Sequence, residues 1–179
     1  MAWSAPMTAV ANSTFTAAQF NQFVRDNLNE TAPAKATAAS QIPVSTGINA
    51  IAMRSPVTAR VDTSQTTNVV FYTNLATPGP AVTVATGPMA LVWWACDMSN
   101  NTSNSLTQCS VAVTGATSIP ANDQWMLSTD GLTADNLNRH SMAHLFTGLT
   151  PGNNTFTMKY AVGSNVGTFR GRQIVVLPL

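Results

Sequence analysis

The fold of this chain is decided by residues 144–179, which read HLFTGLTPGNNTFTMKYAVGSNVGTFRGRQIVVLPL. Within them, residues 148–154 place glycine, proline and asparagine between two apolar runs, and these residue types supply the fixed and left-handed backbone angles of a tight reversal. We predict a hairpin at this point. The strand that follows has an apolar face that alternates with more polar residues, formed by Phe156, Met158, Tyr160 and Val162. Such alternation is typical of a strand with one side against a core.

Two other segments, residues 89–96 and 174–179, are apolar on both faces of a strand. In the first of them the large side chains divide between the two faces, with Leu91 and Trp93 on one and Val92, Trp94 and Cys96 on the other. The core of one sandwich covers only one face of such a strand, so we expect a second copy of the chain to cover the other. We predict Trp94, Val175 and Leu177 as interface residues.

From residue 56 onward the pattern is strand and turn throughout. Apolar runs such as residues 57–61, 68–72 and 107–115 are separated by turns rich in proline, glycine and asparagine. This gives about eight or nine strands at intervals of roughly ten residues, with no helical period among them. The pattern predicts a mainly β domain over residues 56–179, an antiparallel β-sandwich of jelly-roll type.

Charged residues make up only 8% of the chain, against an average near 25%. The net charge is +1 and the basic residues are scattered singly, so no stripe of positive charge is available to bind nucleic acid. An apolar content of 45% argues against disorder. These observations predict a neutral, hydroxyl-rich surface with weak repulsion between copies.

The sequence shows no membrane or secretion signal. No run approaches the roughly eighteen apolar residues of a membrane span, and residues 1–4 lack the charged and apolar regions of a signal peptide. We therefore expect no membrane partner and synthesis in the cytoplasm. Cys96 and Cys109 fall on strands that we expect to be neighbours, so pairing is geometrically allowed, but a reducing compartment favours two buried thiols.

A short helix is predicted to begin at Ala17. Thr16 and Gln19 form a capping box, and Phe15 and Phe20 stand at the positions of a hydrophobic staple. The helix carries one apolar stripe, formed by Phe20, Phe23, Val24 and Leu28. This stripe either packs on the sandwich of the same chain or docks to another subunit or a larger partner.

Residues 31–56 shift to alanine, threonine, serine, proline and glycine without a sustained period. This composition predicts an extended linker that lies along the surface of a partner. We therefore divide the chain into a helix and tether arm over residues 1–55 and the sandwich over residues 56–179.

Signals for catalysis or metal binding are weak. His140 and His144 share one face of a strand about 13 Å apart, which is too far to hold one metal ion. Turn carboxylates such as Asp130 and Asp135 could in principle act as a glycosidase pair, but no supporting motif accompanies them and turn aspartates usually cap local amides. We predict no enzyme, no catalytic residues, no cofactor and no metal. Trp125, beside a polar turn, is the best candidate for an exposed ring that contacts a glycan.

Two groups of segments at the ends of the chain can be compared with known proteins. At the start they are Trp3, Pro6 and residues 15–21, 24–28, 34–37 and 47–50, and at the end they are residues 148–152, 156–160 and 172–179. In these segments the chain resembles structural proteins of tailed bacteriophages that infect actinobacteria, which are usually labelled minor tail or head decoration proteins. The resemblance covers roughly the first 55 and the last 40 residues and is loose between them.

The resemblance implies a virion part: a sandwich that forms a homotrimer and attaches through its N-terminal helix and arm to the major capsid protein or to tail proteins. Its attachment residues would then be Trp3, Phe15, Phe20, Phe23, Val24 and Leu28. Since the chain has no repetitive shaft, we favour a decoration (minor capsid) protein on the capsid exterior that reinforces the shell. The alternative is a minor tail or tail-tip protein whose sandwich binds a host surface glycan.

Overall fold

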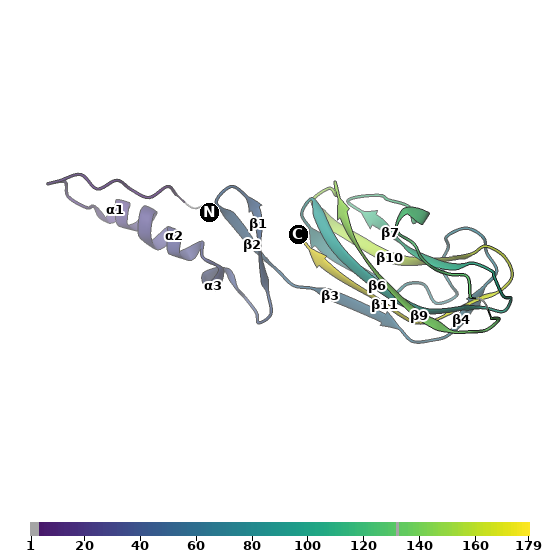
Figure 1. The fold of residues 1–179 in the computed structure, drawn as a ribbon. Coiled ribbons are helices and arrows are strands. Elements are labelled where there is room, and N and C mark those ends of the chain that lie inside the picture. The colour runs from purple at the N-terminus through teal and green to yellow at the C-terminus, as the bar shows by residue number, and fades with distance from the viewer. Residues whose placement is uncertain (1–3, 132) are drawn as a thin grey trace. The chain divides into compact units, whose positions relative to one another are not determined.

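The structure, a computed structural model, describes residues 4–131 and 133–179. The chain forms two compact units, Met1–Ser55 and Pro56–Pro178, which are described separately below. The first unit contains the short helices and one hairpin, and the second contains the sandwich (Figure 1).

The helical part of the first unit begins at Ala17, as the sequence predicts. Thr16 accepts a hydrogen bond from the Gln19 amide at 3.2 Å, and the Gln19 side chain accepts one from the Thr16 amide at 2.9 Å, which completes the capping box. The ring of Phe15 meets that of Phe20 edge to face at 6.2 Å. The helix continues through one wider turn in the order α1 (Ala17–Phe20), η1 (Asn21–Arg25, a π-helix) and α2 (Asp26–Asn29).

Residues 31–56 are not the extended linker that their composition predicts. They form a helical turn, α3 (Ala32–Lys35), and an antiparallel hairpin of β1 (Ile42–Gly47) and β2 (Ala50–Arg54). Asn49 takes a left-handed conformation with φ of 56° in the turn, and the register shifts between Ser45 and Gly47. Asparagine adopts such angles readily, so this Gly-Ile-Asn turn between two apolar runs was the signal for the hairpin.

The second unit is a sandwich of two antiparallel sheets. The four-stranded sheet has the order β5-β10-β7-β8; the five-stranded sheet has the order β3-β11-β6-β9, with β4 also paired to β11. The strands are β3 (Val57–Val61), β4 (Gln65–Thr67), β5 (Ala81–Thr86), β6 (Met89–Asn100), β7 (Thr107–Gly115), β8 (Leu127–Thr129), β9 (Asn138–Thr147), β10 (Gly152–Val162) and β11 (Gly167–Pro178). The predicted fold class, a mainly β sandwich preceded by a short helix, is confirmed.

The core lies between the inner faces of the two sheets. Strand β10 contributes the buried alternating residues that its sequence predicts, namely Phe156, Met158, Tyr160 and Val162. From the opposite sheet, Val92, Trp94 and Ile174 are buried against them. Inward side chains of both sheets therefore form one apolar cluster, as in other sandwiches.

The turn at residues 148–151 does not make the predicted hairpin. Strand β9 before it pairs with β6 in the five-stranded sheet, whereas β10 after it pairs with β5 and β7 in the four-stranded sheet. The turn therefore carries the chain from one sheet to the other. A tight reversal fixes the direction of the next strand but not its hydrogen-bonding partner, so the sequence located the turn and not the topology.

The predicted strand at residues 68–72 is also wrong. This segment is irregular, and its neighbour Thr73 makes only an isolated bridge to Tyr160. Val69 still accepts a hydrogen bond from the Val162 amide at 3.0 Å, while Val70 and Phe71 are exposed. The segment lies along β10 beyond the end of β5 without a continuous ladder of hydrogen bonds.

Candidate interaction surface

The register of β6 decides which of its two apolar faces belongs to the core. Val92, Trp94 and Cys96 point inward, and Trp94 is only 1% exposed. The prediction of Trp94 as an interface residue is therefore wrong, because its indole is in the core of its own chain. Its neighbour Trp93, on the opposite face, is 40% exposed. The sequence had separated these two faces, but it gave no sign of which one the second sheet would cover.

Val175 and Leu177 lie on the same outer face as Trp93. Val175 is paired with Trp93, and Leu177 with Leu91, across β11 and β6. Leu91 is paired in turn with Leu145 on β9. Together with Met89 these residues form what we call the apolar patch, defined as Met89, Leu91, Trp93, Leu145, Val175 and Leu177. It crosses the three neighbouring strands β11, β6 and β9.

A shallow hollow of about 390 Å³ adjoins the apolar patch. Its lining combines Trp93, Ala143 and Val175 with the polar side chains Ser141 and Gln173. Gln173 lies opposite Ala95, and Ala95 lies opposite Ser141, so this row follows the apolar patch along the strands. The outer face thus changes from aliphatic and aromatic to uncharged polar.

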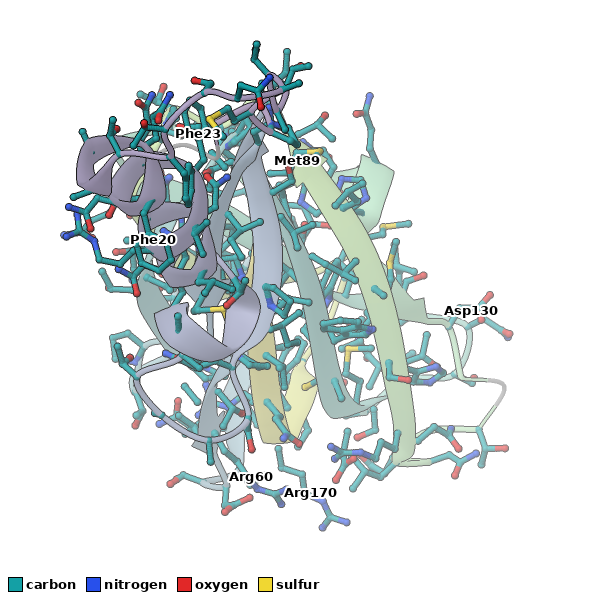
Figure 2. All side chains as sticks on the ribbon, turned by 90° about the vertical axis from the view of Figure 1, so that its left-hand side faces the viewer. Phe20, Phe23, Arg60, Met89, Asp130 and Arg170 are labelled. Carbon is teal, nitrogen blue, oxygen red and sulfur yellow. The ribbon has the colours of Figure 1, made fainter. Side chains whose placement is uncertain are left out.

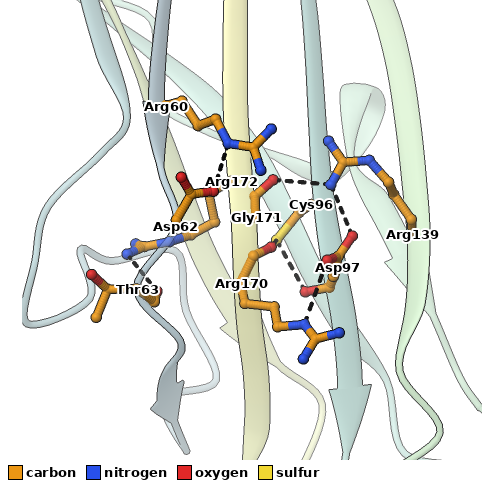
Figure 3. Close-up of polar contacts among 9 residues, drawn as sticks. All are labelled: Arg60, Asp62, Thr63, Cys96, Asp97, Arg139, Arg170, Gly171 and Arg172. Atoms are coloured by element: carbon orange, nitrogen blue, oxygen red, sulfur yellow. Dashed lines mark hydrogen bonds and ion pairs between the residues drawn. The ribbon is translucent and has the colours of Figure 1, made fainter.

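Charged side chains occupy the far end of the same face. The Asp97 carboxylate forms ion pairs with Arg139 at 2.9 Å and with Arg170 at 3.5 Å (Figure 3). Arg60 on β3 forms an ion pair with Asp62, two residues further along the chain. Figure 2 shows Met89 near one end of the sheet and Arg60 and Arg170 near the other. The face therefore has an apolar end and an end where both signs of charge are paired.

The helix of the first unit presents a second apolar surface. Phe20 is 49% and Leu28 is 60% exposed, and Phe15 is exposed as well. Phe23 and Val24 are only half-buried (Phe20 and Phe23 are labelled in Figure 2). The predicted attachment residues of the helix are thus accessible within their unit. Trp3, also predicted there, lies outside the described residues.

Trp125 is not the exposed ring that its polar neighbours predict. It is 9% exposed, and its Nε1 donates a hydrogen bond to the Val111 carbonyl at 2.9 Å. The ring stacks on His144 with a centroid separation of 5.0 Å. Asn122 caps the turn η2 (Asp123–Trp125) by accepting from the Gln124 amide, and the indole at the end of this turn is buried. A glycan has no open indole face to stack on at this residue.

The described residues contain no group of three or more metal-ligating side chains, and no helix among them is long and apolar enough to cross a membrane.

Cys96 and Cys109 are free and buried, and they lie in opposite sheets rather than on the neighbouring strands expected. Burial raises the pKa of the Cys109 thiol, which keeps it protonated and unreactive. Asp123 accepts a hydrogen bond from the Tyr72 hydroxyl at 2.7 Å.

No protein-family model matches this chain, and no curated protein is similar to it in sequence. Among solved structures, the chain is similar to the VP2 subviral particle of infectious bursal disease virus, with a TM-score of 0.50 and 9% identity over 77% of this chain. Structures of the Gt and Gx strains of that virus give TM-scores of 0.48 and 0.41, at 11% and 9% identity over 77% and 78% of this chain.

This chain spans 38% of the matched chain in the first two of these structures and 36% of it in the third. At 9% identity the likeness to the VP2 subviral particle is one of fold. The sandwich described above is thus an architecture that the VP2 subviral particle of this virus also has, while the sequences differ almost throughout.

Proposed function

We propose that this chain is a non-enzymatic structural protein of a tailed phage virion, a trimeric decoration protein on the capsid exterior. In this role the first unit attaches to the major capsid protein and the sandwich reinforces the shell by contacting its neighbours. The resemblance of both chain ends to minor tail and decoration proteins supports the proposal, as does a sandwich fold that the VP2 subviral particle of infectious bursal disease virus shares.

The observation that carries the proposal is the exposed stripe of the first unit. A helix this short does not persist on its own in water, so it needs a surface to pack against. Two of its large apolar side chains, Phe20 and Leu28, nevertheless remain about half exposed or more within their unit. A capsid or tail surface that covers them would bury apolar area and would hold the chain on the particle.

The test uses particles that lack this protein and compares purified full-length chains for rebinding by sedimentation. The double variant Phe20→Ser with Leu28→Ser should lose most of its binding, because both substitutions remove apolar contact area from the stripe. The matched control is Gln22→Ser with Asn29→Ser, which changes exposed polar residues of the same helix. Equal binding of the two variants would overturn attachment through the helix.

An electron cryo-microscopy map of the particle then tests the location. Density at the threefold positions of the shell is the expected result. The alternative, a tail protein that binds a host glycan, is favoured by one observation: Trp93 is exposed beside Ser141 and Gln173. Density only at the tail would overturn the decoration role and would make this hollow the candidate glycan site.

A further inference from the structure

We infer that the apolar patch of the five-stranded sheet is the surface through which copies of this chain contact one another. The inference rests on the self-association in the proposed function and assigns it to named residues. The patch comprises Met89, Leu91, Trp93, Leu145, Val175 and Leu177, of which Trp93 is 40% and Leu145 is 44% exposed. Because the pairing of the strands places them in register, their exposed areas are contiguous rather than scattered.

The other sheet of the same molecule shows what a water-facing surface looks like in this chain. On β10 the outward residues include Thr155, Thr157 and Lys159, and Thr155 shares a hydrogen bond of 2.8 Å with Thr83 on β5. Antiparallel sheets usually have one face on the core and one polar face toward water. The four-stranded sheet follows this rule and the five-stranded sheet breaks it, which indicates that its outer face is covered.

The size and flatness of the patch fit a protein surface better than a small molecule. From Met89 to Trp93 the strand rises about 14 Å, and the three strands β11, β6 and β9 span about 10 Å between the outer two. This matches the apolar centre of an interface of standard size, which buries about 800 Å² on each partner. A small ligand in the adjoining shallow hollow would leave much of its surface in water, whereas binding pockets normally enclose their ligand.

The charges beside the patch favour a second copy of the chain over a partner of opposite charge. Asp97 lies between Arg139 and Arg170, and Asp62 lies beside Arg60, so the charged end of the face carries both signs. A surface that carries both signs of charge can meet another copy of the chain without net repulsion, in a trimer as in a dimer. The net charge of +1 adds almost no repulsion between copies.

The test is the mass of the full-length chain in solution, measured by light scattering after size exclusion over a range of concentrations. We expect wild type to form an oligomer and Leu145→Asp to be shifted to monomer, with the dissociation constant raised at least about 30-fold by a charge placed in the contact. The matched control, Thr83→Asp, introduces the same charge on the exposed outward face of β5, which like β9 is an edge strand. It should leave the oligomer intact.

Wild type that stays monomeric at tens of micromolar, or Leu145→Asp that associates like wild type, would overturn the inference. Iodide quenching of tryptophan fluorescence in the Trp3→Phe variant, which keeps Trp93, Trp94 and Trp125, gives a measurement independent of any change in the patch. Trp93 should become protected as the concentration rises, whereas Trp94 and Trp125 are buried already. Rebinding to particles separates this inference from the proposed function, because Leu145→Asp should still dock through its unchanged helix. The helix variant should in turn lose docking to the particle and keep the oligomer, because its apolar patch is unchanged.

Discussion

Arg172 is a fully buried arginine that binds backbone carbonyls. Its Nη1 donates to the carbonyls of Thr77 and Gly79, each at 3.1 Å, and its Nη2 donates to that of Thr63 at 3.3 Å. The guanidinium also lies 5.4 Å from the centre of the Tyr160 ring. One side chain of β11 thereby holds both the link between β3 and β4 and the irregular segment between β4 and β5, and nothing in the sequence distinguishes this arginine from its exposed neighbours.

Replacing Arg172 by leucine should lower the free energy of unfolding by at least about 2 kcal/mol, because the carbonyls of Thr63 and Thr77 lose a charged donor in a buried site. The matched control is Arg170→Leu on the same strand, whose side chain is exposed and pairs with Asp97 across the sheet surface. It should change stability by less than about 1 kcal/mol. Urea unfolding followed by fluorescence measures both, and equal effects would contradict the role of the buried donor.

His144 is an inward-facing histidine next to Trp125 and Phe146. The ring centroids are 5.0 Å and 4.8 Å away, respectively. Burial lowers the pKa of His144 below its usual value, because the charged form loses hydration. The unfolded chain therefore takes up a proton at this residue near pH 6.5 while the folded chain does not.

It follows that His144 stabilises the fold above about pH 6.5 and that this stability is lost as the pH falls below it. We expect the midpoint of urea unfolding to decrease between pH 7 and pH 5. His144→Gln, which cannot be protonated, should make this part of the pH profile flatter. An unchanged slope in the variant would assign the acid sensitivity to other groups.

At the scale of elements, Asn27 connects the helix to the chain before it. Its Oδ1 accepts from the Ser4 amide at 2.8 Å, and its Nδ2 donates to the carbonyls of Ser4 and Phe23, each at 3.1 Å. Asn27 is the buried residue of this helix. The side chain thus holds residue 4 against α2 by two hydrogen bonds.

Asn27→Ala should release the segment before the helix, and exchange of the Ser4 amide with deuterium should become at least about tenfold faster, as expected when a hydrogen bond of roughly 1.5 kcal/mol is lost. Asn29→Ala is the control, since Asn29 is exposed two residues further along. Nuclear magnetic resonance resolves the single amide. Similar exchange in both variants would show that the segment is held by other contacts.

Local signals in the sequence predicted local structure well. The capping residues Thr16 and Gln19 located the start of the helix, and the alternation from Phe156 to Val162 gave the buried face of β10. Both depend on residues close in sequence, whose hydrogen bonds or periodicity can be inferred without knowing the rest of the chain. The hairpin of β1 and β2 was missed because its composition resembled a linker.

Features that depend on distant partners were not predictable in the same way. Trp93 and Trp94 are adjacent and identical in type, and only the second sheet determines which one is buried. Trp125 has polar neighbours, yet its surroundings in space are His144 and Phe146. The sequence therefore indicated β6 and β11 as strands with two apolar faces, while the choice of the outward residue within β6 required the three-dimensional structure.

At the scale of the whole molecule, the two units differ in how much core supports them. The sandwich has a large cluster of buried residues, whereas the first unit relies on short helical turns and one two-stranded hairpin. An isolated two-stranded hairpin is marginally stable in water. We therefore expect trypsin to cut the free protein first after Lys35 or Arg54.

A fragment that begins at Ser55 should then persist, because its arginines and Lys159 lie on strands of a packed sandwich. Mass spectrometry of a digestion time course identifies the cuts. Early cleavage after Arg139 or Lys159, at the rate of the cuts in the first unit, would contradict a separately stable sandwich.

The central position of β11 also determines when the molecule can fold during its synthesis. Strand β11 lies between β3 and β6. The Thr58 hydroxyl on β3 donates a hydrogen bond to the Ile174 carbonyl on β11, and the two residues are 116 positions apart in the sequence. At about 5–20 residues per second, a ribosome needs roughly 6–23 s to make the residues between these two partners. During that time β6 has emerged with both apolar faces uncovered. The five-stranded sheet closes only after β11 leaves the ribosome, so copies can associate through this sheet only afterwards.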